Sequence, residues 1–310
     1  MLQTSLIDRF TNESPLVKAA FLAAVASLLA SAFTLFTTVI SGPIKYWFDN
    51  MALTAKLNIE YRYKNLAELQ NLTRRYKGLL LAGAESLNTR FWNLYKNESN
   101  LWMDVNGDYL VPRYYFRSWV QRLARVVATA TAFENEALYI DQAIATETDF
   151  QFIYMLKSWT YVLSNVALFE GTDYDKSRQY DHLFQDTVRS IGEAAWVDGH
   201  FASDDQFEVL MSSHRDVRSL CALLDGIKSS EKRLRWDRLV CFHILLLIFL
   251  NTFGYPVHKS SEEQFEKVIG KIGNRQIMQN LKDVLTLWHL RKSEAGQLAY
   301  RLLEKHAACA

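Results

Sequence analysis

Arg238 and His243 are the residues of this sequence whose types and spacing best suit acid–base chemistry. They are joined by three apolar residues and a cysteine in Arg238-Leu-Val-Cys-Phe-His243. If the two side chains lay together on a helix, the histidine could activate a 2′-hydroxyl and the arginine could stabilise a phosphorane. The alternative is a buried histidine beside an arginine that pairs with Asp237 or Glu231. The sequence leaves both alternatives open.

A second candidate is a row of arginines in a stretch without acidic residues. It consists of Arg113, Arg117, Arg122 and Arg125, and it is interleaved with Tyr114, Tyr115, Phe116 and Trp119. Guanidinium groups bind phosphates, and aromatic faces stack on bases. The four arginines and Trp119 therefore predict a site for a nucleotide or nucleic acid. The alternative is an ordinary helix whose aromatic face is buried and whose arginines face solvent or anionic lipid.

Acidic residues gather in several loops, but without the spacing of a metal site. These loops contain Asp173 and Asp175, Asp181 and His182, and Asp198 with His200, Asp204 and Asp205. Helix capping and the helix dipole already favour acids at such positions. The sequence has no P-loop, GxGxxG, GxSxG or HExxH motif. We therefore expect no metal, no cofactor and no enzymatic activity, apart from the alternative at Arg238 and His243.

The elements that must position these residues are predicted to be helices. The chain has 310 residues, of which 49% are hydrophobic, so it can bury a substantial core. Four prolines and twelve glycines are few for this length, which favours long helices. The formal net charge is +1, so any basic binding surface must be local. The three cysteines lack CxxC or metal spacing and fit a reducing cytoplasm.

The stretch from Ala19 to Ile40, AAFLAAVASLLASAFTLFTTVI, carries no charge. A helix of about 20 apolar residues crosses the hydrocarbon core of a bilayer and satisfies its own backbone hydrogen bonds. A cleaved signal peptide is the alternative, but its apolar core is only about 7–15 residues long. We therefore predict a retained transmembrane helix.

The charges around this stretch predict its orientation. Only Arg9 and Lys18 precede it, whereas seven basic residues follow closely: Lys45, Lys56, Arg62, Lys64, Arg74, Arg75 and Lys77. Positive charge near a membrane span stays on the cytoplasmic side. We therefore expect a single-pass protein of the cell membrane, with its N-terminus outside and its C-terminal domain in the cytoplasm.

The predicted transmembrane helix has two unlike faces. At about 100° per residue, small and hydroxyl-bearing residues fall on one stripe, which consists of Ala20, Ala24, Ser27, Ser31, Thr34 and Thr38. Bulky residues fall on the opposite stripe, which consists of Leu22, Val25, Leu29, Phe33, Phe36 and Ile40. Small residues at this spacing let helices pack closely in lipid. We therefore expect a homo-oligomer in which the small stripe forms the contact or lines a pore; the alternative is that small residues are merely tolerated in lipid.

We expect an all-α chain with one small β-hairpin, divided into four parts. These are a short extracytoplasmic N-terminus (1–16), the transmembrane helix (17–42), a juxtamembrane or stalk helix (43–97) and a cytoplasmic helical domain (98–310). Gly42-Pro43 predicts a break at the end of the transmembrane helix, and Asn106-Gly107 predicts the hairpin. Further helices are expected near 113–132, 134–146, 148–169, 177–196, 204–225, 231–253, 261–272, 275–291 and 293–306.

Two local patterns refine this scheme. Ser261-Glu-Glu-Gln264 predicts a capping box at the start of a helix. The apolar run from Leu239 to Leu250 is too short to span a membrane and contains His243, so we predict a buried core helix rather than a second span.

The order of parts resembles that of bacterial membrane effectors of anti-phage defence, in particular the Hailong type. The resemblance rests on an N-terminal span, the basic helix EYRYKNLAELQNLTRRYKGLLLAGAESLNTRFWNLY and a helical domain with RLRWDRLVCFHILLLIFLNTFGYP. It implies an antiviral ion channel that oligomerises through its N-terminal helix. It also implies gating by a nucleotide or oligonucleotide that a partner nucleotidyltransferase makes. The Arg-x4-His spacing instead resembles HEPN-type ribonucleases, and a membrane-tethered nuclease or a non-catalytic membrane scaffold are the alternatives.

Overall fold

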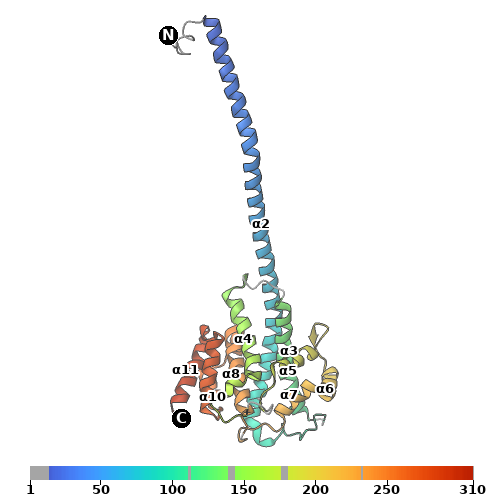
Figure 1. Cartoon of the computed structure of the whole chain (residues 1–310). Coiled ribbons are helices and arrows are strands. Elements are labelled where there is room, and N and C mark those ends of the chain that lie inside the picture. The colour runs from blue at the N-terminus through green and yellow to red at the C-terminus, as the bar shows by residue number, and fades with distance from the viewer. Residues whose placement is uncertain (1–13, 111–112, 139–143, 176–180, 232, 310) are drawn as a thin grey trace. The chain divides into compact units, whose positions relative to one another are not determined.

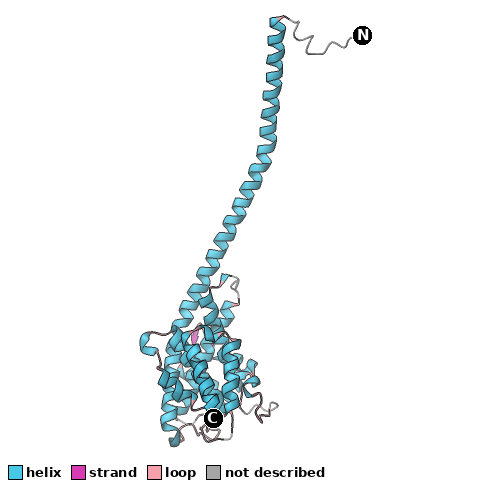
Figure 2. Cartoon of the chain, turned by 90° about the vertical axis from the view of Figure 1, so that its left-hand side faces the viewer, coloured by secondary structure: helices cyan, strands magenta, loops and turns pink. Residues whose placement is uncertain are grey.

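The computed structural model describes residues 14–110, 113–138, 144–175, 181–231 and 233–309. About 80% of the chain is helical and about 1% is strand, which confirms the all-α fold class. The chain divides into two compact units, Met1–Lys64 and Asn65–Ala310, here called unit 1 and unit 2. Figure 1 labels the helices, and Figure 2 shows that helix dominates the secondary structure.

The first described helix, α2, runs without interruption over Pro15–Asn97. It contains Pro43, so the expected break at Gly42-Pro43 is wrong. Proline removes one backbone donor and disturbs the preceding turn, but long apolar helices tolerate such a position. The transmembrane and stalk helices that we predicted separately are one helix.

The C-terminal part of α2 belongs to the core of unit 2. Leu69, Leu72, Tyr76 and Leu80, which recur at helical spacing, are all buried. The remaining α-helices of the described chain are α3 (Tyr114–Ala137), α4 (Glu147–Ser164), α5 (Gln185–Ala195), α6 (Asp204–Ser213), α7 (Arg215–Leu224), α8 (Arg235–Phe253), α9 (Glu262–Ile269), α10 (Arg275–Leu287) and α11 (Glu294–Cys309). Short 3-10 helices lie at Glu98–Asn100 (η1), Val166–Phe169 (η3), Pro256–His258 (η4) and Leu290–Lys292 (η5).

Helix α8 is the central helix of unit 2, since every residue from Arg235 to Leu250 is buried. It packs against α4, α9 and α11, while α3 packs along α5. The approach of α5 to α3 requires Gly192, because a Cβ atom there would lie 2.2 Å from Thr131 Oγ1. The prediction of a buried core helix over Leu239–Leu250 is confirmed.

Capping residues begin several of these helices. Ser261 accepts a hydrogen bond from Gln264 N, and the Gln264 side chain accepts from Ser261 N, so the predicted capping box is confirmed. The same reciprocal pattern begins α4 at Thr146 and α6 at Ser203. Such caps each stabilise a helix by about 1 kcal/mol.

The hairpin does not lie where Asn106-Gly107 predicts it. Strands β1 (Trp196–Val197) and β2 (His200–Phe201) pair instead across Asp198-Gly199. Asp198 and Gly199 have φ angles of 49° and 81°, as a tight two-residue turn requires.

Asn106 and Gly107 adopt similar angles, with φ of 53° and 80°, but no strands flank them. Their backbone donors are taken by a remote carboxylate. Asp225 accepts from Val105 N at 2.9 Å, from Asn106 N at 3.2 Å and from Gly107 N at 2.7 Å. The turn therefore forms, but its backbone N–H groups donate to the side chain of Asp225, the C-cap residue of α7, rather than to a second strand.

Candidate membrane-spanning helix and basic surfaces

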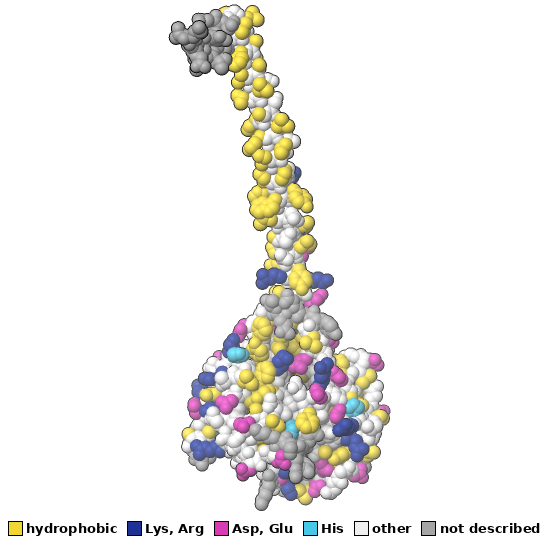
Figure 3. Space-filling view, viewed as in Figure 1, with side chains coloured by type: hydrophobic (Ala, Val, Ile, Leu, Met, Phe, Trp, Pro, Cys, Tyr) yellow, Lys and Arg dark blue, Asp and Glu magenta, His cyan; other side chains and the backbone are white. Residues whose placement is uncertain are grey.

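The N-terminal half of α2 presents apolar side chains without any cover within unit 1. From Pro15 to Lys64 every residue is exposed except Lys18, which is half-buried. Leu28 is 71% exposed and Phe33 is 70% exposed, and hydrophobic side chains follow this length of α2 in Figure 3. A monomer in water rarely leaves more than a few hundred Å² of contiguous apolar surface uncovered. By length and composition, this segment can span a membrane.

Three hydroxyl groups of the small stripe donate to backbone carbonyls of the same helix. Ser31 Oγ donates to Ser27 O at 2.8 Å, Thr34 Oγ1 donates to Ala30 O at 2.7 Å, and Thr38 Oγ1 donates to Thr34 O at 2.7 Å. A single helix therefore carries these hydroxyls into lipid without an unpaired donor. Their remaining acceptor capacity faces outward, where lipid, water or another helix can meet it.

A second helix, α8, is also long and apolar enough to span a membrane, but most of it is buried within unit 2. Its residues fill the centre of a packed helical core rather than facing outward. Core helices of soluble domains commonly have this composition. Burial thus explains the hydrophobicity of α8.

Arg238 lies inside unit 2 and is 0% exposed. Its guanidinium donates to the backbone carbonyls of Val162 and Asn165 and lies 4.2 Å from the Phe169 ring centroid. Burial lowers the pKa of Arg238 to about 9, and the nearby groups Tyr174, Cys241 and Asp181 only partly offset this effect. The expected pairing of Arg238 with Asp237 or Glu231 is wrong.

Those two acids have other partners. Asp237 accepts from Gly273 N at 2.7 Å and from Asn274 N at 3.1 Å, which ties α8 to the loop before α10. Glu231 forms an ion pair of 2.8 Å with Arg235. The arginine that pairs with Glu231 is therefore three positions before Arg238.

His243 points from α8 toward α2 rather than toward the contacts of Arg238. Its Nδ1 lies 2.9 Å from the Tyr95 hydroxyl, and its Nε2 lies 2.8 Å from Asn88 Oδ1. Because Oδ1 can only accept, Nε2 carries the proton and Nδ1 accepts from Tyr95. Burial lowers the pKa of His243 to about 3, so the ring is neutral near pH 7.

Five positions on one helix separate these side chains by about 140° around the axis, which sends them to different neighbours. Both are buried and they contact separate elements; both ring nitrogens of His243 have partners, whereas Arg238 donates through Nη1 and Nη2 and its buried Nε has no partner in the structure. This geometry matches the core-histidine alternative. The two side chains do not meet at a position where both could contact one substrate, and their burial leaves no access for a phosphodiester.

The predicted arginine row lies on α3, but its members have different environments. Trp119 is 0% exposed and packs 4.8 Å from Phe91, so it is a core residue. Arg117 forms an ion pair of 2.7 Å with Glu208 on α6. Arg113, just before α3, is exposed and donates to Asp104 O. A stacking role for Trp119 therefore finds no support in the structure.

The last two arginines of the row, three positions apart on α3, differ in exposure. Arg122 is half-buried, and its Nη1 donates to Ser86 O of α2 at 2.7 Å. Arg125 is exposed, and its guanidinium lies 4.8 Å from the Phe201 ring centroid. Of the five predicted residues, Arg113 and Arg125 thus remain on the surface, whereas Arg122 reaches back to α2.

Arg90 also lies in this region, although the sequence patterns above do not single it out. Arg90 lies on α2, and its guanidinium is 5.1 Å from the Tyr114 ring and 5.0 Å from the Tyr115 ring. It occupies the buried face of α2, at helical spacing from Leu87 and Leu94. A lone arginine on an otherwise apolar helix face is the sequence feature that could have revealed it.

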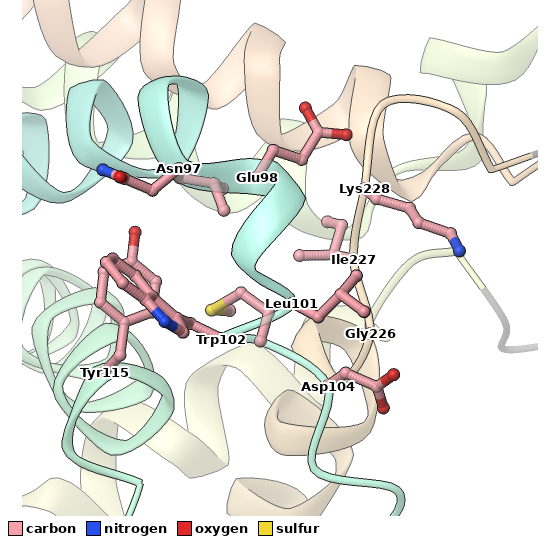
Figure 4. Close-up of a pocket in the computed structure, with 11 residues that line it drawn as sticks. Asn97, Glu98, Leu101, Trp102, Asp104, Tyr115, Gly226, Ile227 and Lys228 are labelled. Carbon is pink, nitrogen blue, oxygen red and sulfur yellow. The ribbon is translucent and has the colours of Figure 1, made fainter.

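Two hollows are relevant to ligand binding. The first, of about 20 Å³, lies at the end of α2, is lined by Trp102, Tyr115 and Lys228 among others, and holds no more than a water molecule (Figure 4). The second is a groove of about 480 Å³ between α10, η5 and α11. Its lining is basic and has no acid: Thr286, His289, Arg291, Lys292, Gln297, Tyr300 and Arg301.

The groove's cations are partly engaged. Arg291 stacks 4.0 Å from the Tyr300 ring centroid, and Lys292 pairs with Glu147 of α4. The groove is therefore a second basic surface, separate from the arginine row. Two of the acids considered as metal ligands have other partners: Asp181 accepts from Arg233 Nε at 2.7 Å, and Asp204 accepts from Gln121 at 2.6 Å.

Comparison with protein-family models, with curated proteins and with solved structures finds no match to this chain. The features that bear on its function are the exposed apolar helix, the packed helical unit and the distribution of charge on that unit.

Proposed function

We propose that the chain is a single-pass protein of the bacterial inner membrane, with unit 2 in the cytoplasm. The observation that carries this proposal is the fully exposed apolar segment of α2, whose side chains need lipid or a partner. Exposed Tyr46, Trp47 and Phe48 follow it, as interfacial aromatic residues do. The excess of basic residues from Lys45 onward supports a cytoplasmic location for unit 2.

Copies of the chain associate through the small stripe. Its members, Ala20, Ala24, Ser27, Ser31, Thr34 and Thr38, alternate in steps of four and three residues, which averages to the 3.5-residue repeat of left-handed helix packing. Small side chains allow backbones to approach, and the opposite bulky stripe suits acyl chains. Hydroxyls on the shared face would give an assembly a polar interior.

The assembly acts as an ion-conducting or membrane-disrupting effector of antiviral defence, gated by a nucleotide or oligonucleotide from a partner nucleotidyltransferase. The resemblance in layout and the basic surfaces of unit 2 support this role. A ligand must favour one state over the other: about 5.5 kcal/mol of differential binding moves a switch from 1:99 to 99:1. Several arginine–phosphate contacts are sufficient to supply it.

Cysteine crosslinking in native membranes tests the association directly. Ser31→Cys lies on the small stripe and Phe33→Cys on the bulky stripe. Both are made in a chain that carries Cys309→Ser, and the other native cysteines, Cys221 and Cys241, are buried. We expect oxidation to join copies through position 31 and not through position 33. Equal crosslinking at both positions, or none at position 31, would refute association through this face.

Ion flux tests the pore. Thr34→Leu and Ser31→Leu should abolish ion leakage through the membrane without reducing expression, because leucine would close a hydroxyl-lined path. Phe36→Leu on the bulky stripe is the matched control and should leave the leakage unchanged. Unchanged conductance in the stripe variants would reject the pore while leaving membrane anchoring intact.

A further inference from the structure

Arg90 of α2 is a buried cation that forms no ion pair with an acid in the described part of the chain. Only 7% of the residue is exposed, and its Nε is buried without a hydrogen-bond partner in the structure. The faces of Tyr114 and Tyr115 lie against its guanidinium at 5.1 Å and 5.0 Å. Aromatic faces partly replace lost hydration of a cation, but they do not neutralise it.

Arg122 of α3 brings a second cation to the same place. Its Nη1 donates to Ser86 O at 2.7 Å, and Ser86 is one helical turn before Arg90 on α2. Arg122 also interacts with Tyr114, whose ring contacts Arg90. The pKa of Arg122 is lowered, first by burial and next by the charge of Arg90. Two guanidinium groups therefore share one partly buried region.

The acids of the neighbouring elements are directed elsewhere. Glu208 pairs with Arg117, Asp204 accepts from Gln121, and Glu85 pairs with His258. Within the described chain, no ion pair joins a carboxylate to Arg90 or Arg122. A pair of like charges that is partly removed from water is unfavourable unless something of opposite charge compensates it.

We propose that Arg90 and Arg122 together bind a phosphoryl group of a soluble ligand between α2 and α3. Guanidinium forks match phosphate oxygens in a bidentate manner, and two of them make a site with strong preference for a doubly charged anion. Tyr114 is 69% exposed beside the pair, so its ring is available to stack on a base. The ligand class is therefore a nucleotide or the phosphate end of an oligonucleotide.

The site has a regulatory consequence that rests on the proposed function. One arginine belongs to α2, the helix that also carries the apolar segment, and the other belongs to α3 of unit 2. A bound phosphoryl group would tie α2 to α3 and remove the repulsion between the arginines. Ligand binding thereby acts on the element that would form the membrane assembly, whereas the anion site itself requires no membrane.

Thermal unfolding of the full chain in a neutral detergent tests the site. The probes are inorganic phosphate, pyrophosphate and ADP, each compared with chloride at equal ionic strength. With ligand at about 100 times its Kd, the Tm of unit 2 should rise by about 5 °C or more. Arg122→Gln should weaken binding at least tenfold, and Arg189→Gln, an exposed arginine paired with Glu193 on α5, is the control that should bind as the wild type does.

Arg122→Lys separates a loss of binding from a defect in folding. It keeps the positive charge but loses the planar fork, so it should fold and still bind pyrophosphate at least tenfold more weakly. Equal shifts of Tm in the wild type, Arg122→Gln and Arg122→Lys would overturn the site, as would a wild type that responds to phosphate no more than to chloride.

Nanodiscs distinguish a soluble ligand from a lipid headgroup. The shift with pyrophosphate should be the same in phosphatidylcholine and in phosphatidylglycerol discs. A stabilisation that appears only with phosphatidylglycerol, and not with the soluble anions, would overturn the soluble ligand. Since these measurements involve neither crosslinking nor conductance, their outcome is separate from that of the pore.

Discussion

The hydroxyl of Tyr95 lies 2.9 Å from Nδ1 of His243 and joins the last turns of α2 to the middle of α8. Asn88 binds the other ring nitrogen, and the Phe91 ring stacks on the imidazole with centroids 4.2 Å apart. These three residues of α2 lie on one face, at spacings of three and four. His243 is therefore a polar bridge between the first helix of unit 2 and its central helix.

Loss of this bridge should cost stability. We expect His243→Ala to lower the free energy of unfolding by about 3 kcal/mol, because it removes two hydrogen bonds and leaves a cavity. Urea denaturation of the full chain in detergent, followed by tryptophan fluorescence, measures this. His200→Ala, in the exposed hairpin, should change it by less than about 0.5 kcal/mol. A His243→Ala chain that kept its stability but lost a ribonuclease activity would instead establish the catalytic alternative.

The same residue predicts a pH dependence. The pKa of His243 is lowered to about 3 in the folded chain, against an ordinary value of 6.5. Below pH 6.5 the unfolded chain binds this proton and the folded chain does not, so stability falls as the pH drops from 6.5 toward 3. Relative to pH 7, the loss from this residue at pH 4.5 should be about 2.5 kcal/mol. His243→Gln should remove that part of the slope in urea titrations, and an unchanged slope would contradict it.

Asp225 should hold the loop that begins after α2. Its carboxylate accepts from three consecutive backbone donors, of Val105, Asn106 and Gly107. Asp225→Ala should cost about 2 kcal/mol and expose this loop to proteases, because three backbone N–H groups, that of buried Val105 among them, would lose a charged acceptor. Asp198→Ala, in the turn of the true hairpin, is the comparison, and its loop 105–107 should stay resistant. Protection of the loop in both variants would show that the carboxylate is dispensable.

Features that depend on the spacing of residues within one helix could be predicted from the sequence. The uncharged stretch Ala19–Ile40, the buried face of α2 at Leu69, Leu72 and Tyr76, and the core position of α8 all follow from hydrophobic repeats along one helix. The capping box at Ser261 is equally local, since its two hydrogen bonds join residues three positions apart.

Contacts between distant segments were not predictable in the same way. Asn106-Gly107 forms its turn, but Asp225, more than a hundred residues away, takes the donors that a hairpin strand would use. Arg238 binds the carbonyls of Val162 and Asn165 at the end of α4 rather than an acid on its own helix. The pairing of Arg90 with Arg122 likewise arises only when α2 and α3 pack. Such partners are far apart in the sequence and meet only in the folded chain, so a pattern along the sequence does not predict them.

Charge placed on the bulky stripe tests whether the α2 segment lies in lipid. Arginine at the centre of a membrane helix costs about 2.5–3.5 kcal/mol on insertion, so Leu29→Arg together with Phe33→Arg should move much of the intact chain from the membrane pellet to the soluble or aggregated fraction after carbonate extraction. Leu53→Arg and Leu57→Arg, on exposed positions of the same helix beyond the uncharged stretch, form the matched control and should leave the chain in the membrane. A wild-type chain that is already extracted by carbonate would exclude the spanning helix, and with it the assembly, because the exposed leucines and phenylalanines would then need a protein partner instead of lipid.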